Sequence, residues 1–291
     1  MKKMLVLTDL TDNSANAYRY AAQLACQLQA SIQLVFSFNG AAMTLNSHSL
    51  HSQKLQSFAK RYACASLQKN DGNRTECLLC SDKWLEALPL LVGVHQPDLI
   101  IAGSDILEQI HQEQGPMPLQ ALEQYPILWV PDQAHFQAPK HLLFVTDYTD
   151  QDPAIVEQVK AFAHLFQAEV TLIHFYSATD RVRLAQIKKE GEVLHRLLAS
   201  TGLRYYLREE EDTVKGVYAF TTENPVDIIL FATRDTHLAH KYFSSFNQKN
   251  LSPNATVPLL NLYQELKKAC AGNCRLCQES KSTAAISALE L

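Results

Sequence analysis

The sequence has no long hydrophobic run. Hydrophobic residues make up 47% of its 291 residues, yet the longest apolar stretches, such as residues 227–232, are only as long as a β-strand. A transmembrane helix needs roughly 18 to 20 consecutive apolar residues. The first apolar stretch ends at Asp9, which is too early for the hydrophobic segment of a signal peptide. We therefore expect no membrane partner and a cytoplasmic location.

The sequence also has no excess of either charge. It contains 26 Lys and Arg against 30 Asp and Glu, which gives a formal net charge of −4 and no electrostatic reason to expect a nucleic-acid partner. The seven cysteines are an odd count, which favours reduced thiols over a framework of disulfides. The length predicts about two domains, and the average composition excludes a wholly disordered chain.

Several catalytic motifs are missing. There is no Gly-x-Ser-x-Gly elbow for a nucleophilic hydrolase and no His-Glu-x-x-His pair for zinc. A phosphoacceptor receiver domain needs an Asp at the end of its third strand and a Lys after its fifth, but the third strands here end in residues 79–81 and 207–209, without an Asp, and no Lys closely follows Val130. An ATP-pyrophosphatase needs a Ser/Gly-rich loop after its first strand, where this chain has residues 8–12, Thr-Asp-Leu-Thr-Asp. We expect the protein not to be an enzyme, although slow ATP hydrolysis is left open.

An internal repeat organises the chain. Residues 2–12 recur as residues 140–150, so that Asp9 corresponds to Asp147, 138 positions later. Two further pairs of segments match at shorter offsets, residues 98–102 with 227–231 and residues 126–130 with 258–262. A repeat this long indicates two copies of one domain. We predict a first domain at residues 1–132, a second at 139–264, a Pro-flanked connector at 131–139 and a cysteine-containing tail at 265–291.

Each copy alternates strand-like and helix-like segments. Continuous apolar runs of strand length are typical of strands that are covered on both faces, and side chains that cap helices follow the first run at residues 11–14. Alternating β and α elements predict parallel strands joined by right-handed crossovers, and hence an open, doubly wound α/β sheet. The expected strands are 4–8, 32–38, 74–79, 99–102 and 127–130, then 142–146, 170–176, 203–208, 228–232 and 259–262. Later helices are expected at 49–68, 82–94, 181–200 and 212–222.

This topology predicts where a ligand would bind. In doubly wound sheets, ligands lie beyond the carboxyl ends of the strands where the strand order reverses, here between the first and fourth strands. Ser37 and Phe175, at the ends of the second strands, are further candidates. The remaining candidate binding residues are Thr8, Asp9, Leu10, Gly103 and Ser104 in the first copy and Thr146, Asp147, Tyr148, Thr233 and Arg234 in the second.

These motifs resemble the universal stress protein family in its tandem, two-domain form. The resemblance rests on residues 5–9, 21–25, 32–37, 97–104 and 126–130, and spans about residues 2–264. It implies two flavodoxin-like domains of the adenine nucleotide alpha hydrolase-like type, each with a five-stranded parallel sheet of order 3-2-1-4-5 and helices on both faces. It also implies that the two domains pair through their fifth strands, as a pseudo-dimer within one chain.

The resemblance further implies a division between members that bind nucleotides and members that do not. The binders carry Gly-x-x-Gly, nine residues and then Gly-Ser/Thr after the fourth strand, because glycines let backbone N–H groups surround a triphosphate. Here no glycine follows Gly103 until Gly115, whose neighbour Pro116 has no N–H to donate, and residues 233–240 contain none. The sequence therefore predicts a non-enzymatic stress-response protein with degenerate nucleotide-binding loops, acting by protein association or sensing. The alternative is a stress protein that binds ATP or another adenine nucleotide at Asp9 or Asp147, with weak or no hydrolysis.

Two interpretations stay open for Asp9 and Asp147. The resemblance places these carboxylates near the ribose or adenine of a nucleotide. Asp side chains at such turns also cap the helix that follows. Neither interpretation names the protein partner, and a homodimer is also possible.

The cysteines present two candidate metal sites of different quality. Cys77 and Cys80 lie three residues apart in an expected strand, so their side chains point to opposite faces and are expected to be ordinary thiols. Cys270, Cys274 and Cys277 lie close together in the tail and could supply most of a zinc site. The competing interpretation is a flexible terminus with free or redox-sensitive thiols.

Overall fold

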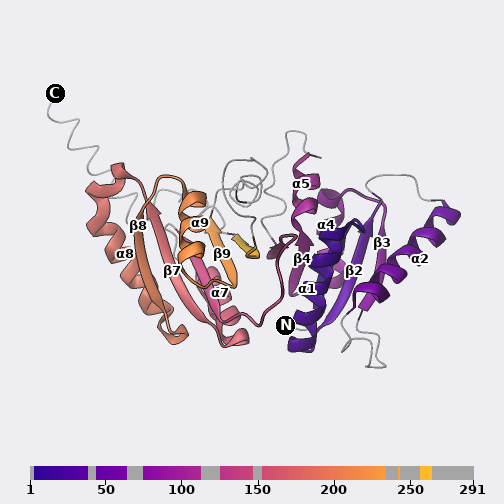
Figure 1. Ribbon diagram of the computed structural model, residues 1–291, viewed down its shortest axis with the longest axis horizontal. Coiled ribbons are helices and arrows are strands. Elements are labelled where there is room, and N and C mark those ends of the chain that lie inside the picture. Colours follow the sequence, from indigo (N-terminus) through magenta and orange to yellow (C-terminus); the bar gives the residue numbers. More distant parts are fainter. Residues whose placement is uncertain are drawn as a thin grey trace, which may run out of the picture.

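A computed structural model shows a ten-stranded sheet covered by helices on both faces. It describes residues 3–38, 44–63, 75–112, 125–146, 153–233, 242 and 256–263. Figure 1 shows the two halves of the chain side by side, the first coloured indigo to magenta and the second pink to orange. The strand order is β3-β2-β1-β4-β5-β10-β9-β6-β7-β8. Each half thus has the order 3-2-1-4-5, which confirms the predicted fold class.

The first half alternates five strands with four helices among the described residues. Its strands are β1 (Lys3–Thr8), β2 (Ser31–Ser37), β3 (Thr75–Cys80), β4 (Leu99–Gly103) and β5 (Ile127–Val130). Its helices are α1 (Asp12–Leu28), α2 (Leu45–Tyr62), α4 (Trp84–His95) and α5 (Ser104–Gln112).

The second half repeats this alternation. Its strands are β6 (His141–Thr146), β7 (Glu169–Tyr176), β8 (Arg204–Glu209), β9 (Ile228–Thr233) and β10 (Leu259–Tyr263). The helical segments are α7 (Pro153–Phe166), η1 (Ala178–Arg183), α8 (Leu184–Leu197), η2 (Ala199–Thr201) and α9 (Thr213–Glu223), of which η1 and η2 are 3₁₀ turns.

The two halves meet at one antiparallel pair of strands. Strands within each half are parallel, whereas β5 and β10 run in opposite directions, with Leu260 opposite Leu128. The resemblance predicts a five-stranded sheet in each domain and pairing of the two domains through their fifth strands. In the structure, the pairing of β5 with β10 joins them into one continuous sheet whose strand direction changes only at its centre.

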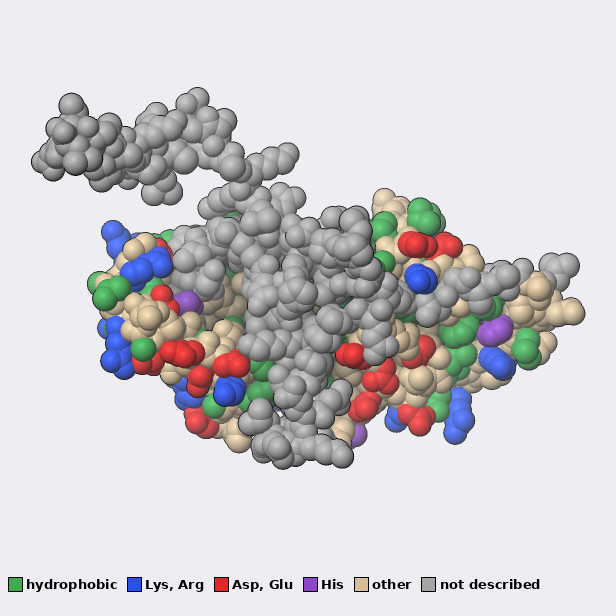
Figure 2. Space-filling model, turned by 90° about the horizontal axis from the view of Figure 1, so that it is seen from above, with side chains coloured by type: hydrophobic (Ala, Val, Ile, Leu, Met, Phe, Trp, Pro, Cys, Tyr) green, Lys and Arg blue, Asp and Glu red, His purple; other side chains and the backbone are tan. Residues whose placement is uncertain are grey.

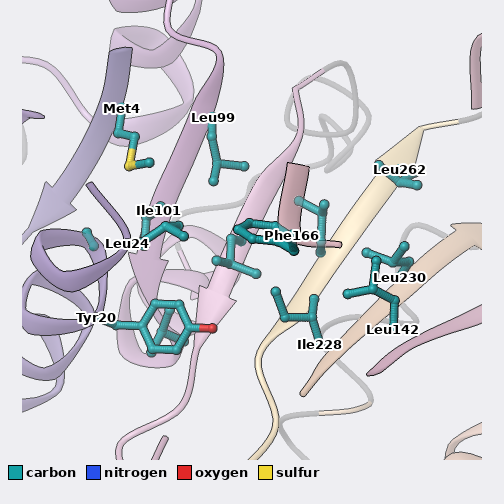
Figure 3. Packing of buried hydrophobic residues seen from close by; sticks show 14 of the residues in the cluster. Met4, Tyr20, Leu24, Leu99, Ile101, Leu142, Phe166, Ile228, Leu230 and Leu262 are labelled. Carbon is teal, nitrogen blue, oxygen red and sulfur yellow. The ribbon is translucent and has the colours of Figure 1, made fainter. Parts of the chain in front are cut away.

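Each face of the sheet has its own hydrophobic core. One core packs α1, α2, α7 and α8 on the sheet, and the other packs α4, α5 and α9. Neighbouring strand residues alternate between them, as with Val6 in the first and Leu7 in the second, both fully buried. Figure 3 shows Tyr20 and Ile101 of the first half in the same cluster as Ile228 of the second. The core of this face is therefore continuous across the two halves.

The repeat is visible in the backbone. Gln29 and Gln167, 138 positions apart, both adopt the left-handed conformation after the first helix of their half, with φ of 53° and 52°. In both places the next residue, an alanine, donates its N–H to an alanine carbonyl five residues earlier, at 3.0 and 2.9 Å. This hydrogen bond is typical of helices that end in a residue with the left-handed conformation.

Two expected helices lie at different positions in the structure. The sequence predicts a helix at 49–68, but α2 begins at Leu45 because Thr44 and Ser47 form a reciprocal capping box. It ends at Tyr62, and residues 64–68 lie outside the described residues. The helix expected at 181–200 divides into η1, α8 and η2.

The connector between the halves is fixed against α1. The Asn16 side-chain amide donates to the carbonyl oxygens of Pro131 and Ala134, at 2.9 and 3.0 Å. The Phe136 ring packs edge-on against Tyr20, with 5.1 Å between the ring centres. Among the described residues, no helix is long and apolar enough to cross a membrane.

Candidate functional site

The carboxyl ends of β1 and β4 bring together the first group of predicted site residues. The two strands are paired, so the turn of Thr8, Asp9 and Leu10 lies beside Gly103 and Ser104. Thr8 is fully buried, and its hydroxyl accepts the Leu10 N–H at 3.0 Å. This bond closes the turn in which Leu10 has a left-handed φ of 67°.

The Asp9 carboxylate is bonded to its own turn and to α5. Its Oδ1 accepts the Thr11 N–H at 3.0 Å and the hydroxyls of Thr11 and Ser14, both at 2.6 Å. Its Oδ2 accepts the Gln109 side-chain amide at 2.5 Å. Partial burial would raise the pKa of Asp9, but these hydrogen bonds outweigh it and lower the pKa below its usual value. The carboxylate is therefore ionised and well supplied with donors from the chain itself.

Asn13 is the central residue of this site, and sequence reasoning did not single it out. It lies in the first turn of α1 and is 4% exposed. Its side-chain amide donates to the Ser104 hydroxyl at 3.1 Å and to the Asp132 carboxylate. Its Oδ1 accepts the Asp105 N–H at 3.2 Å. Asn13 therefore binds the first turn of α5, where an N–H would otherwise be available to an anion.

Gly103 provides the space that Asn13 occupies. A Cβ atom added to Gly103 would lie 1.8 Å from Asn13 Oδ1 and 2.9 Å from its Cγ. No side chain can be accommodated at that separation unless Asn13 moves. The glycine that resembles part of a phosphate-binding motif is therefore needed for contact between two parts of the protein.

Helix α5 begins where nucleotide-binding members carry their glycine loop. The sequence analysis assigns no helix to residues 104–112, although Ile106, Leu107 and Ile110 have helical spacing and are buried in the core. The backbone N–H groups of these residues therefore belong largely to a helix. They do not form an open loop that could surround a phosphate.

The electrostatic environment of this site is acidic. Partial burial raises the pKa of Asp105, and the nearby carboxylates of Asp132, Asp9 and Glu108 raise it further. Four carboxyl groups around one helix N-terminus oppose the approach of a phosphate. On the face shown in Figure 2, groups of acidic side chains lie in both halves of the molecule, with basic side chains interspersed among them.

Ser37 and Phe175, at the ends of the second strands, have structural partners. The Ser37 hydroxyl donates to the Asp82 carbonyl at 2.6 Å and so fixes the turn after β3. Phe175 is 8% exposed and belongs to the core beneath α9. A Cβ at Gly216 would lie 2.4 Å from the Phe175 ring, so this glycine allows α9 to approach the sheet closely.

The second predicted crevice is described only in part. Thr146 ends β6 and is 5% exposed, and its carbonyl is 2.9 Å from His174 Nδ1. Thr233 ends β9. The other three candidates in this crevice, Asp147, Tyr148 and Arg234, lie outside the described residues.

Cys77 and Cys80 lie on opposite faces of the edge strand β3. Cys77 packs against the core beneath α1 and α2, and Cys80 packs against the core beneath α4. Both thiols are free, and burial raises the pKa of each. The described residues contain no group of three or more His, Cys, Asp or Glu side chains placed to hold a metal ion. The tail candidates Cys270, Cys274 and Cys277 lie outside the described residues.

Comparisons with known proteins agree with this fold. No family model matches the chain, and no curated protein does. Among solved structures, a universal stress protein from Archaeoglobus fulgidus is similar over 91% of this chain and 97% of its own, at 14% identity and a TM-score of 0.58. A putative universal stress protein from Pseudomonas aeruginosa is similar over 90% of this chain and 93% of its own, at 12% identity and a TM-score of 0.53.

A protein of unknown function from Pseudomonas aeruginosa is also similar, at 11% identity and a TM-score of 0.50, over 90% of this chain and 92% of its own. At sequence identities this low, the similarity is evidence for the fold alone. The chain has the fold of universal stress proteins, as its motifs predicted.

Proposed function

We propose that this protein is a non-enzymatic, cytoplasmic stress-response protein that acts by protein association or sensing, and that its first crevice does not hold a nucleotide. The observation that carries the proposal is the contact between Asn13 and Gly103. It supports a crevice that is filled by the protein's own side chains.

A triphosphate needs free backbone N–H donors, space, and a potential that attracts anions. The Asp105 N–H already donates to Asn13, and the side chain of Asn13 fills the space beside Gly103. The carboxylates of Asp9, Asp105 and Asp132 make the local potential negative. At this one place, therefore, the N–H donor is occupied, the space is filled and the potential repels anions.

The Asp9 carboxylate would also have to exchange partners to bind a ribose. It accepts hydrogen bonds from Thr11, Ser14 and Gln109, and loss of bonds of this charge-assisted kind costs about 1.5 to 3 kcal/mol each. A sugar hydroxyl would replace one bond with another of similar strength and leave a protein donor unpaired. The geometry of Asp9 therefore supports a role in fixing the turn before α1 and its N-cap residue, Thr11.

Calorimetric titration of the full chain with ATP and magnesium tests the proposal. We expect no saturable heat in the micromolar range and no release of phosphate beyond the buffer control. Saturable binding that is lost in Asp9→Ala would show that the argument about the first crevice is wrong. Binding that persists in Asp9→Ala and is lost in Asp147→Ala would instead establish the alternative, an adenine-nucleotide-binding protein that uses its second half.

A further inference from the structure

The helices α1 and α2 carry basic side chains around one tyrosine. Both helices cover the same face of the sheet in the first half (Figure 1). Tyr62 ends α2, and its partly buried ring packs edge-on against Phe58, with 4.9 Å between the ring centres. The guanidinium carbons of Arg19 on α1 and Arg61 on α2 each lie 5.3 Å from the centre of the Tyr62 ring. The ring therefore brings two arginines from neighbouring helices together.

A third cation lies on the same side of α2 as Arg61. Lys54 precedes Arg61 by two helical turns, which is about 10 Å along the helix axis. The side chains of Arg19, Lys54 and Arg61 are all exposed. We call these three residues and Tyr62 the basic cluster.

The basic cluster has no carboxylate beside it on its own helices. Helix α2 contains no Asp or Glu, and the one carboxylate of α1 is Asp12, about 10 Å along the helix axis from Arg19. The ion pairs between described residues all lie in the second half and involve Lys160, Arg181, Arg204 and Arg208. In the described part of the chain, the three cations of the cluster form no ion pair. This local excess of positive charge occurs in a chain whose net charge is −4.

The repeat shows that the fold does not require this charge distribution. The helices at the corresponding places in the second half, α7 and α8, carry Glu157, Glu190 and Glu192 among their cations. Arg196 lies in the last turn of α8, as Arg61 does in the last turn of α2, but it follows Glu192 by one turn. Both halves build the same sheet with the same helical cover. The unbalanced cations of the first half therefore indicate a role other than folding.

We propose that the basic cluster binds an acidic segment of a partner protein. The guanidinium groups of Arg19 and Arg61 can hold one carboxylate through charge-assisted hydrogen bonds. In an extended segment, alternate side chains lie about 7 Å apart on the same side, so a second carboxylate comes within reach of the long Lys54 side chain. The proposal rests on the protein-association function proposed above and names the chemistry of the partner.

A nucleic acid or a free phosphate fits the basic cluster less well. Nucleic-acid binding depends on many phosphate contacts, and the cluster supplies three cations. Asp9 and Asp12, at the start of α1, would repel a polyanion that continued past Arg19 toward the carboxyl ends of the strands. A free phosphate would bind the two arginines and leave Lys54 without a partner. The number and placement of the charges therefore favour a short acidic segment.

Fluorescence anisotropy of the full chain with a labelled peptide of about eight alternating Glu and Ser residues tests the proposal. At about 50 mM salt we expect a dissociation constant of about 0.1 mM, because exposed ion pairs are individually weak. Arg19→Gln and Arg61→Gln should each raise it about 3- to 5-fold, and the double variant about 10-fold. The matched control is Arg196→Gln on α8, an exposed arginine outside the basic cluster, which should leave the dissociation constant unchanged. Equal urea midpoints would confirm that the variants remain folded.

Three further probes separate the possible occupants. The same peptide with Gln in place of every Glu should not bind. An oligonucleotide of the same net charge should bind more weakly than the peptide. Inorganic phosphate at about 10 mM should displace the peptide no more than chloride of equal ionic strength does.

Several results would overturn the proposal. They are a peptide that does not bind at about 1 mM, equal affinity for wild type and the double arginine variant, tighter binding of the oligonucleotide, and displacement that is specific to phosphate. The titration with ATP involves the crevice and not the basic cluster. The proposal for the cluster can therefore fail while the proposal for the crevice stands, and the reverse.

Discussion

Replacing Gly103 with alanine should destabilise the protein through its effect on Asn13. The new Cβ would lie 1.8 Å from Asn13 Oδ1, a separation that no two non-bonded heavy atoms can sustain, so the Asn13 side chain must rotate away. Rotation breaks its hydrogen bonds to Ser104, Asp132 and the Asp105 N–H. The variant thus tests whether the first crevice is filled in the way that the structure describes.

The size of the effect can be estimated from these bonds. A hydrogen bond contributes about 1 kcal/mol net, and loss of a helix cap costs about the same. Losing the bonds of Asn13 should therefore cost about 3 kcal/mol. The lower entropy of the unfolded chain with alanine returns about 0.4 to 1 kcal/mol. We expect the free energy of unfolding to fall by roughly 2 to 3 kcal/mol.

Urea denaturation at low protein concentration measures this change, and Gly93→Ala is the matched control. Gly93 lies in a helix with open space around it, so alanine there should stabilise the protein by about 0.5 to 1 kcal/mol. In the double variant Asn13→Ala/Gly103→Ala the clash is gone, so its cost should be smaller than the sum of the single costs. A loss below about 0.5 kcal/mol for Gly103→Ala, or strict additivity, would refute the reasoning.

Three further predictions concern other parts of the structure. Asp227→Ala should lower the free energy of unfolding by about 2 kcal/mol, and Asp227→Asn should lower it by less. The reason is that Asp227 Oδ2 accepts two backbone N–H groups at the start of β6, at 2.7 and 2.9 Å. Equal urea midpoints for wild type and Asp227→Ala would contradict this prediction. Asp105→Asn should gain stability relative to wild type as the pH rises from about 4 toward neutral, because a raised pKa means that the folded chain is destabilised when the Asp105 carboxyl ionises. Urea titrations at several pH values should show that the difference in the free energy of unfolding between variant and wild type grows with pH. A difference that stays constant or shrinks would count against this prediction. Cys77 and Cys80 should react with iodoacetamide more slowly in the folded chain than in urea, because burial raises the pKa of both thiols. Peptide mass mapping measures the two reaction rates. A disulfide between Cys77 and Cys80 after mild oxidation would disprove their placement on opposite faces of β3.

Most of the fold could be predicted because its signals are local and occur twice. Strands that are covered on both faces produce continuous apolar runs, which fixes the strands without any knowledge of tertiary contacts. Asp98 and Asp227 show that the repeat includes polar residues as well as hydrophobic ones. Each carboxylate accepts the backbone N–H of the first residue of the first strand in its half, from Lys3 or His141. The same structural requirement is met by the same residue type in both places.

The site could be predicted only in outline. Strand order places Asp9 beside Gly103, but nothing in the spacing shows that Asn13 occupies the position next to that glycine. The two residues are 90 positions apart, and an Asn among residues 11–14 is equally typical of an ordinary helix cap. Helix α5 was not predicted, because its segment was compared only with a glycine-containing phosphate loop. The helical spacing of Ile106 and Ile110 was the available signal.

The antiparallel seam between β5 and β10 has a consequence for dilute conditions. It joins only three residue pairs, and two separate chains that met through so short a seam would depend on their abundance to find each other. Covalent fusion through the connector replaces that search by an effective concentration of about a millimolar or more. A cell that makes very few copies of this protein would still contain the complete ten-stranded sheet in each of them.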